Sequence, residues 1–503
     1  MKTPAKVAPT PDNPDLHDAE RALVAERRVR DKLDEIVRFV RTDAQGEELH
    51  EVERAVFGQL LGLGQALMGL FLAEKGTGKV EAGYVTTPEG VDLPYHSTKT
   101  RKNYLSIFGK VPIRRAYYWG QGADTGWCPL DAELNLPKQR FSYLLQEWGE
   151  LLGVDSSFEQ VTERLDALLG LKFWTQGVQD VARTASADVQ AFYEQKPAPE
   201  PSTEGELLVA TVDGKGVPIR PEEPRGRKLR IGSGEKPNKK KEAVVSGVYT
   251  VERYVRTAED VIREIDDRGC VVPPEPPPPP RPRPQNKRVR ATMLGKDVAF
   301  AEVRRQLEQR DPGGTKQRIG LTDGAESLQD RVLSELAGPS GIVLILDVMH
   351  VLTYLWAVST VDHKDGTAEA GRWVMNKLRL LLEGKVGYVI GGFRQRLGQS
   401  KGLNKGKRKA LNKAINYMER NRAFMAYDVY LAAGYPIASG VAEGACKHLV
   451  KDRMERTGMR WTPEGAQAML ELRAVELNGD WRDLWRFHVA QQRERLYGAQ
   501  RAA

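Results

Sequence analysis

Cysteine is scarce in this chain of 503 residues, and long apolar runs are missing. The three cysteines, Cys128, Cys270 and Cys446, lie too far apart in sequence to form a disulfide framework or a CxxC zinc site. We therefore expect a reducing, cytoplasmic environment. No run of eighteen or more apolar residues occurs, and the N-terminal residues lack the apolar core of a signal peptide. These absences predict a chain with no membrane span and no membrane partner.

Positive charge is the clearest excess in the composition. The formal net charge is +8 and the pI is about 9.1, and the excess is concentrated in two runs. Arg225–Lys241 contains eight Lys or Arg against one acid, and Arg394–Arg422 contains ten against one. Clustered basic side chains fit contacts to a phosphate backbone, although any single run can be solvated surface. The candidate contacts are Lys239, Lys240, Lys241, Lys405, Lys407, Arg408 and Lys409.

The N-terminal half is expected to be mainly helical and to bind DNA. Residues 1–20 are rich in proline and charge, which predicts a disordered tail, and a helical and hairpin region follows over 21–200. The segment Lys102–Tyr118 predicts a hairpin around its central Gly-Lys pair. Residues Phe158–Ala182 have a helix-turn-helix shape with a turn near Gly170, although an ordinary helical hairpin fits them equally well.

The C-terminal half alternates strands and helices. Three apolar strands each end in an aspartate, a long helical stretch follows, and a late helix carries a glutamate. Consecutive strand–helix units predict an α/β fold with a mixed sheet and helices over its faces. The expected ranges are 205–350 for the first part of this core, 273–285 for a proline-rich insertion within it, 351–435 for an all-helical insertion and 436–490 for a C-terminal helical region.

Four acidic residues form the candidate site. Asp213, Asp323 and Asp347 follow the three apolar strands, and Glu443 lies on the late helix. Ligands of such sheets bind beyond the carboxyl ends of the strands, so these side chains are expected to meet there. Each residue also has an ordinary explanation. Asp213 and Asp323 precede glycines as in common turns, Asp347 can cap the following helix, and Glu443 can be a surface charge.

Clustered carboxylates repel one another unless a cation neutralises them. Hard oxygen ligands suit Mg²⁺ or Mn²⁺. Two such ions about 3.5–4 Å apart can activate a nucleophile and stabilise the leaving oxygen of an in-line phosphoryl displacement. The acidic pattern therefore predicts a site for two divalent ions.

Four segments of the C-terminal half carry a family resemblance. They are YPIASGVAEGACKHLVKDRMERTGMRW, GAQAMLELRAVELNGDW, LDVMHVLTYLW and TVDGKGV. They resemble bacterial insertion-sequence transposases of the ISKra type, which belong to the DDE class, and the likeness covers most of Glu206–Trp485. It implies an RNase H-like catalytic domain interrupted by a helical insertion. It also implies Mg²⁺-dependent cleavage and joining of double-stranded DNA, at transposon ends and target, and we expect a homo-oligomer on that DNA.

The acidic motifs also resemble those of the wider Mutator-like group. That group has an Asp-Gly pair on the first strand, another on the fourth, an Asp-x-x-His after the fifth and a late helical Glu. The matching residues here are Asp213, Asp323, the pair Asp347 and His350, and Glu443. The resemblance implies that Asp213, Asp323 and Glu443 are the catalytic and metal-binding triad, and that Asp347 and His350 are auxiliary.

On the last helix Glu443 and Lys447 are four residues apart and share one face. The ordinary explanation is an ion pair on the helix surface. In a catalytic site, Glu443 would face the metal and Lys447 a phosphate oxygen, with Lys451 and Arg453 extending the contacts to DNA.

Strand order decides which aspartate is the second member of the triad. If the strand before Asp213 is the first, the strand before Asp323 is the fourth and the strand before Asp347 is the fifth. In the implied fold the first and fourth strands are neighbours, which favours Asp323. The alternative triad is Asp213, Asp347 and Glu443. Two alternative functions also remain, namely a nuclease or non-transposing DNA-binding protein derived from a transposase, and a basic RNA-binding or scaffold protein without catalysis.

Overall fold

The computed structural model describes residues 18–86, 90–121, 126–220, 240–266, 281–399 and 402–498. The chain divides into two compact units, unit 1 with Met1–Phe192 and Trp481–Ala503, and unit 2 with Tyr193–Asp480. Residues 1–17 of the expected tail and most of the expected proline-rich insertion lie outside the described residues, and so do Lys239 and Cys270, whereas residues 18–20 of the expected tail are helical.

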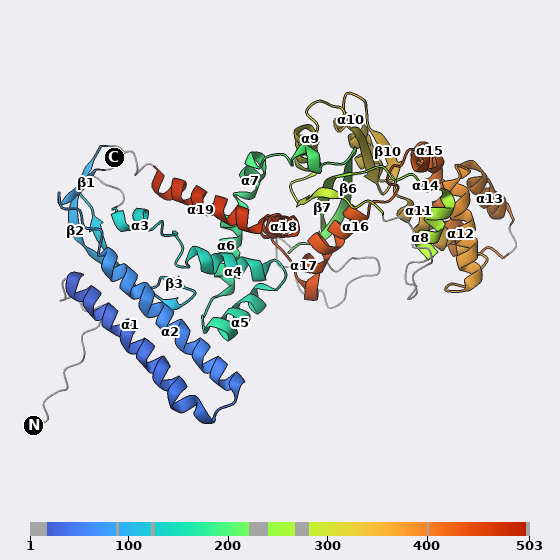
Figure 1. The fold of residues 1–503 in the computed structure, drawn as a ribbon. Helices are drawn as coiled ribbons and strands as arrows, with labels where there is room; N and C mark the ends of the chain where they lie inside the picture. The colour runs from blue at the N-terminus through green and yellow to red at the C-terminus, as the bar shows by residue number, and fades with distance from the viewer. Residues whose placement is uncertain are drawn as a thin grey trace, which may run out of the picture. The chain divides into compact units, whose positions relative to one another are not determined.

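Unit 1 begins with two long helices and a small antiparallel sheet (Figure 1). The helices α1 (Asp18–Arg41) and α2 (Leu49–Lys75) pack along each other. The sheet has the order β1-β2-β5. Its strands are β1 (Tyr84–Thr86), β2 (Asp92–Arg101) and β5 (Ile113–Tyr118), and a separate pair is formed by β3 (Leu105–Ser106) and β4 (Gly109–Lys110).

The hairpin predicted over Lys102–Tyr118 forms only in part. β3 and β4 pair over two residues each, but β5 pairs with β2, which the prediction did not include. The reason is that pairing with β2 buries more apolar surface of β5 than pairing with β4 would. Ala116 and Tyr118 of β5 share a buried cluster with Leu93 of β2, which a two-residue partner cannot supply.

Helix α2 is long and apolar enough to cross a membrane by length and composition alone, and little of its most apolar stretch is buried. One such helix is weak evidence for a membrane span, because core helices of soluble proteins can be equally long and apolar. Here α2 packs along α1, and its Gly64 lies against the ring of Phe108 so closely that a Cβ would not fit. The expectation of no membrane partner therefore stays a prediction.

The segment predicted as a helix-turn-helix forms α5 (Phe158–Leu169) and α6 (Thr175–Ser186), packed with α4 (Tyr143–Gly153). Ser157 and Gln160 form a capping box at the start of α5, and Gly170 ends it in the left-handed conformation with φ 64°. The turn near Gly170 is confirmed. The remaining helices of the N-terminal half are α3 (Pro129–Glu133) and α7 (Val189–Gln195).

The last helix, α19 (Trp481–Tyr497), packs within unit 1. Its His488 lies 2.6 Å from the buried carboxylate of Asp188, and the Tyr497 hydroxyl donates to the carbonyl of Leu136 at 2.6 Å. The sequence placed most of this helix in the C-terminal region 436–490 of the core. Its partners, far back in the chain, could not be read from local pattern.

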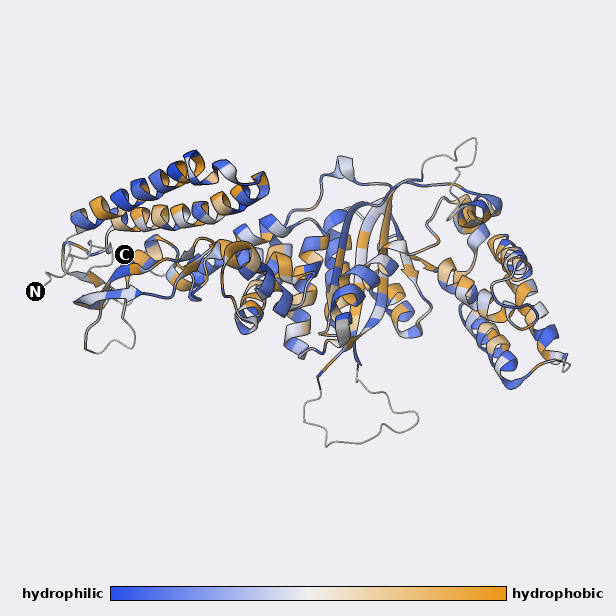
Figure 2. Ribbon diagram, turned by 90° about the horizontal axis from the view of Figure 1, so that it is seen from below, coloured by the Kyte–Doolittle hydropathy of each residue, from blue (hydrophilic) through white to orange (hydrophobic). Residues whose placement is uncertain are grey.

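Unit 2 is built on a mixed five-stranded sheet with the order β10-β9-β6-β7-β8, and these strands carry hydrophobic stretches (Figure 2). β6, β9 and β10 are parallel, whereas β7 runs antiparallel to β6 and to β8. The strands are β6 (Leu207–Pro218), β7 (Lys240–Val251), β8 (Gln285–Thr292), β9 (Gln317–Thr322) and β10 (Val343–Leu346). A mixed sheet within an α/β fold is thus present.

Helices cover both faces of this sheet, and side chains along β6 alternate between two buried clusters, one on each face. Leu208 and Ala210 of β6 pack against α9 and α10. Leu207 and Val209 pack with the helices that follow β10. The helices of unit 2 are α8 (Ala258–Asp266), α9 (Lys296–Arg310), α10 (Glu326–Glu335), α11 (Val348–Ser359), α12 (Ala368–Leu382), α13 (Val386–Gly398), α14 (Lys405–Arg420), α15 (Tyr427–Ala432), α16 (Gly440–Ala445), α17 (Asp452–Met454) and α18 (Pro463–Leu477), with a π-helical turn over Cys446–Lys451.

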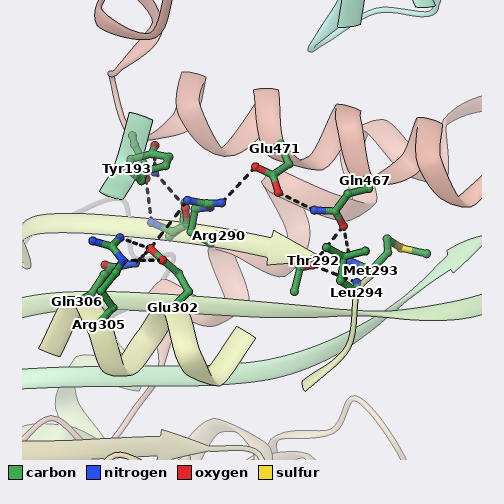
Figure 3. A network of polar contacts seen from close by, with 12 residues as sticks. Tyr193, Arg290, Thr292, Met293, Leu294, Glu302, Arg305, Gln306, Gln467 and Glu471 are labelled. Atoms are coloured by element: carbon green, nitrogen blue, oxygen red, sulfur yellow. Dashed lines mark hydrogen bonds and ion pairs between the residues drawn. The ribbon is translucent and has the colours of Figure 1, made fainter. Parts of the chain in front are cut away.

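A network of charged and amide side chains joins β8 to α9 and α18 (Figure 3). Arg290 donates to Glu471 at 3.1 Å and lies 3.9 Å from Glu302. Gln467 donates to Glu471 and accepts from the backbone N–H of Met293. Burial would raise the pKa of Glu302, but the hydrogen bond from Arg305 and the charge of Arg290 hold it below its usual range. The network fixes α18 against the edge strand of the sheet.

Candidate functional site

Asp213, Asp323 and Asp347 occupy matched positions on three neighbouring strands. Thr211 pairs with Leu321 in the β6–β9 ladder, and Thr322 pairs with Leu346 in the β9–β10 ladder. Continued along the chain, this register brings Asp213, two residues after Thr211, level with Asp323, two residues after Leu321, and with Asp347, one residue after Leu346. The strand order places Asp323 beside Asp213 and Asp347 one place further out, as the strand count required.

The sequence predicts that Asp213 lies near the end of its strand, but in the structure β6 continues to Pro218 along β7. What ends at Thr211 is the parallel pairing with β9. Asp213 therefore lies where β6 leaves β9, and this opens the sheet beside it.

The four acids line one cavity of about 330 Å³, together with His350. The carboxylates come from β6, the ends of β9 and β10, and α16, which lie far apart in the sequence but meet here. Lys215, Lys447 and Lys451 line the same cavity, so its wall carries both signs of charge.

Both carboxylate oxygens of Asp347 accept hydrogen bonds from the protein. The residue is 3% exposed. Oδ1 accepts from the backbone N–H of Met349 at 2.7 Å, which caps α11. Oδ2 accepts from the backbone N–H of Ser439 at 2.9 Å and from the Ser439 hydroxyl. Asp347 therefore ties the start of α11 to the residue that precedes α16.

Asp323 is held differently. Its Oδ1 accepts from the backbone N–H of Ala325 at 3.0 Å, and no bond to its Oδ2 occurs within the described residues. Its carbonyl accepts from the hydroxyl of Tyr417 at 2.8 Å, and the next carbonyl accepts from Arg420 at 2.9 Å. Both donors lie on α14 of the helical insertion. The insertion thus supports the turn while one carboxylate oxygen remains available.

Gly324 is required at this turn. Its φ is +92°, a conformation that favours glycine. A Cβ added there would lie 2.9 Å from the ring of Tyr417 and 3.0 Å from Leu346. The Asp-Gly pair therefore allows α14 to approach the turn closely.

Asp213 contacts a residue that sequence reasoning missed. Cys446 donates from its thiol to Oδ2 of Asp213 at 3.1 Å, and the N–H of Gly214 donates to Oδ1 at 2.6 Å. Burial, reinforced by the charge of Asp213, raises the pKa of the Cys446 thiol well above its usual range, so the thiol stays protonated and keeps donating. Cys446 lies three residues after Glu443, and that helical spacing was the signal available in the sequence.

Glu443 is exposed on α16, and within the described part of the chain its carboxylate has no hydrogen bond and no ion pair. The surface pair with Lys447 does not form, although both residues line the cavity. Immediately after α16 the helix widens into the π-helical turn that carries Cys446, Lys447 and Lys451. Such widened turns redirect side chains and are frequent at functional sites.

The other basic candidates differ in how accessible their side chains are to a phosphate. Arg453 is 0% exposed, with its guanidinium against Met459 and Trp461, so it is not placed to contact a phosphate. Lys407 donates to the carbonyl of Val361 at 2.6 Å, and Lys240 pairs with Glu455. Side chains open to solvent are those of Lys241, Lys405, Arg408 and Lys409.

The donor chemistry of the cavity fits a hard divalent cation, since its acids offer only carboxylate oxygens. No group of three His, Cys, Asp or Glu among the described residues is close enough to hold an ion as the side chains now lie. Asp213 is turned toward Cys446, and the side chain of Glu443 is exposed to solvent.

Comparison with known proteins adds little. No protein-family model matches the chain, and no curated protein matches it. Among solved structures, the Drosophila P element transposase strand transfer complex is similar at 10% sequence identity, over 71% of this chain and 83% of that chain, with a TM-score of 0.25. A TM-score this low carries no argument about this chain, so its function is inferred from its own geometry.

Proposed function

We propose that this chain is a DDE-type transposase of the ISKra kind, which cleaves and joins DNA with divalent metal in an RNase H-like core. The observation that carries the proposal is the meeting of Asp213, Asp323 and Glu443 in one cavity, from three segments distant in sequence. Lysines line the same cavity, as a site for a phosphodiester requires. The sheet order, with the first strand between the second and the fourth, supports the proposed core.

The residues divide into three roles in this proposal. Asp213, Asp323 and Glu443 hold two Mg²⁺ or Mn²⁺ ions, which supply Lewis-acid stabilisation to an in-line phosphoryl displacement. Lys447 and Lys451 contact the phosphate oxygens. Asp347 positions α16, and thus Glu443, through its bonds to Ser439. His350, exposed at the cavity rim, contacts the DNA strand.

Double-stranded DNA is the proposed partner, as transposon ends and as target. In unit 1, α5 and α6 form the helical pair proposed to select the ends. Lys241, Lys405, Arg408 and Lys409, exposed in the structure, are proposed to hold the backbone. The chain would act in the bacterial cytoplasm as a homo-oligomer on this DNA.

The test uses the full chain and a duplex that carries the ends of its own genetic element. With Mg²⁺, wild type is expected to nick the ends and join them to target, and Asp213→Asn is expected to lose both activities while binding the duplex normally. Cleavage close to wild type in Asp213→Asn overturns the assignment. Cleavage without joining by the wild type supports the alternative, a nuclease derived from a transposase.

A further inference from the structure

A second and larger cavity lies in unit 2, on the other side of α16. Its volume is about 720 Å³, within the range of about 300–1,000 Å³ usual for ligand sites. It is bounded by the end of β7, the start of β8, the loop before α16 and α16 itself. We call it the α16 cavity.

One short helix separates the two cavities. Glu443, Cys446 and Lys447 line the carboxylate cavity, whereas Val441, Gly444 and Ala445 line the α16 cavity. Val441 also packs against β7, where a Cβ on Gly247 would meet it at 2.9 Å. The α16 cavity is thus a separate site one helix away from the carboxylates.

Backbone contacts fix the wall of this cavity. The N–H of Tyr254 donates to the carbonyl of Gly434 at 3.0 Å, and the N–H of Arg256 donates to Leu431 at 3.3 Å. Gly434 has φ +72°, and a Cβ there would lie 2.9 Å from the nitrogen of Tyr254. The segment after β7 is therefore held firmly along the loop that leads to α16.

The charge of the lining is positive. The lining includes four Arg or Lys side chains and one carboxylate, that of Glu252. Arg256 is 7% exposed, and its Nε is buried without a hydrogen-bond partner among the described residues, although Nη1 donates to Glu264 at 3.3 Å. Arg283 and Lys287 have no ion-pair partner in the described part of the chain. Because Arg283 and Lys287 are exposed at this cavity and the positive charges outnumber the one carboxylate in its lining, the arrangement favours an anionic ligand.

The remaining lining is aromatic, proline-rich and small. Tyr254 and Tyr435 line the cavity, each with a guanidinium over its ring, from Arg256 at 5.2 Å and Arg253 at 5.4 Å. The prolines are Pro282, Pro284 and Pro436, and the small residues that leave the space open are Gly434, Ala438, Gly440, Gly444 and Ala445. Flat apolar walls beside cations suit a planar aromatic group that carries a negative charge.

We propose that the α16 cavity binds a nucleotide, with the base against Tyr254 and Tyr435 and the phosphate at Arg283 and Lys287. The source of the nucleotide is an unpaired position in a DNA strand. A free mononucleotide has the same chemistry and is distinguished by the test. The proposal does not depend on metal or on cleavage, because none of the proposed contacts involves the carboxylates.

The test measures stacking directly. A single-stranded DNA pentamer with 2-aminopurine at its centre, and free 2-aminopurine deoxyribonucleoside monophosphate, are titrated with the full chain in EDTA. Stacking on tyrosine quenches the fluorescence. Wild type is expected to quench both probes, with the pentamer bound more tightly because its neighbouring phosphates add contacts. Equal affinity for the two probes assigns the cavity to a free nucleotide and overturns the strand as its source.

Two independent variants locate the binding. Gly444→Leu is designed to fill the cavity, since Gly444 lines it and a Cβ there meets nothing within 4 Å. Arg283→Glu with Lys287→Glu reverses the charge. Each is expected to raise Kd at least about tenfold. The matched controls are Gly391→Leu, an exposed helical glycine with the same open space, and Lys364→Glu, an exposed lysine outside the cavity.

Absence of quenching by the wild type overturns the proposal, and so does quenching that neither variant weakens. If Gly444→Leu fails to fold, the charge-reversal variant still decides the outcome. Asp213→Asn is expected to quench as wild type does. A wild type that quenches both probes but does not cleave therefore counts against the proposed catalytic function alone.

Discussion

Asp323 and Asp347 follow adjacent parallel strands at the same register, yet the protein holds them in opposite ways. Asp347 is buried, and both its oxygens accept hydrogen bonds from Met349 and Ser439. Asp323 is part-exposed, and its Oδ2 has no partner within the described residues. The same sequence pattern, an apolar strand followed by aspartate, produces a structural tether in one place and an available ligand in the other.

The difference arises from what packs beyond each strand. After β10 the chain turns directly into α11, so Asp347 becomes its N-cap and is enclosed by the approach to α16. After β9 the turn at Gly324 is supported through backbone carbonyls by Tyr417 and Arg420, which leaves the carboxylate untouched. Support through the backbone is what keeps a side chain free for a ligand.

The largest expected effect is that of Asp323→Asn. We expect metal-dependent cleavage to fall by more than about 10³-fold, because a ligand of the reacting centre is lost. The stability should change little, since the oxygen that accepts from Ala325 can remain in place. Single-turnover cleavage and urea denaturation measure the two quantities. An active Asp323→Asn beside an inactive, folded Asp347→Asn would reverse the comparison and make Asp347 the second catalytic aspartate.

Asp347→Asn is expected to lower cleavage by about 10–100-fold, the usual range for a residue that orients a ligand. It should also lower the free energy of unfolding by about 1–3 kcal/mol, because an amide leaves a buried donor of Met349 or Ser439 unpaired. Ser439→Ala is the matched variant and should reproduce part of both losses. A stability equal to wild type would show that the tether contributes nothing.

Gly324→Ala tests the turn beside Asp323. We expect a loss of about 1–3 kcal/mol of stability, since alanine is strained at φ +92° and its Cβ meets Tyr417. Cleavage should fall more than binding of the duplex. Gly391→Ala, an exposed helical glycine with open space around it, is the control and should be neutral or stabilising. Equal behaviour of the two variants in thermal unfolding would contradict a special turn at Gly324.

The smallest expected effects are those of Tyr417→Phe and Tyr427→Phe. Tyr417 donates to the carbonyl of Asp323 at 2.8 Å, and Tyr427 donates to that of Leu346, just before Asp347, at 2.9 Å. Each Tyr→Phe change should cost about 1 kcal/mol of stability. Only Tyr417→Phe should reduce cleavage, by a few-fold, because Asp347 keeps its own tethers. An equal loss of cleavage in both variants would mean that the support of the end of β9 and the support of the end of β10 affect the site equally.

Local pattern predicted much of what surrounds the site. Apolar strands followed by Asp213, Asp323 and Asp347, and their alternation with helices, led to the mixed sheet. The adjacency of the first and fourth strands was predicted from the fold that the family resemblance implies, and the sheet has it. The partner of β5 and the packing of α19 in unit 1 depend on segments far away in the chain, so local pattern could not predict them.

Sequence by itself determined which residues stand at the ends of the strands and that Glu443 lies on a late helix. Tertiary structure decided how each is used. It enclosed Asp347 with Ser439, brought Cys446 to Asp213, buried Arg453, and left Glu443 and one oxygen of Asp323 without partners in the described residues. The physical reason is that a carboxylate's role is set by the donors that surround it, and donors arrive from any part of the chain once the core has packed.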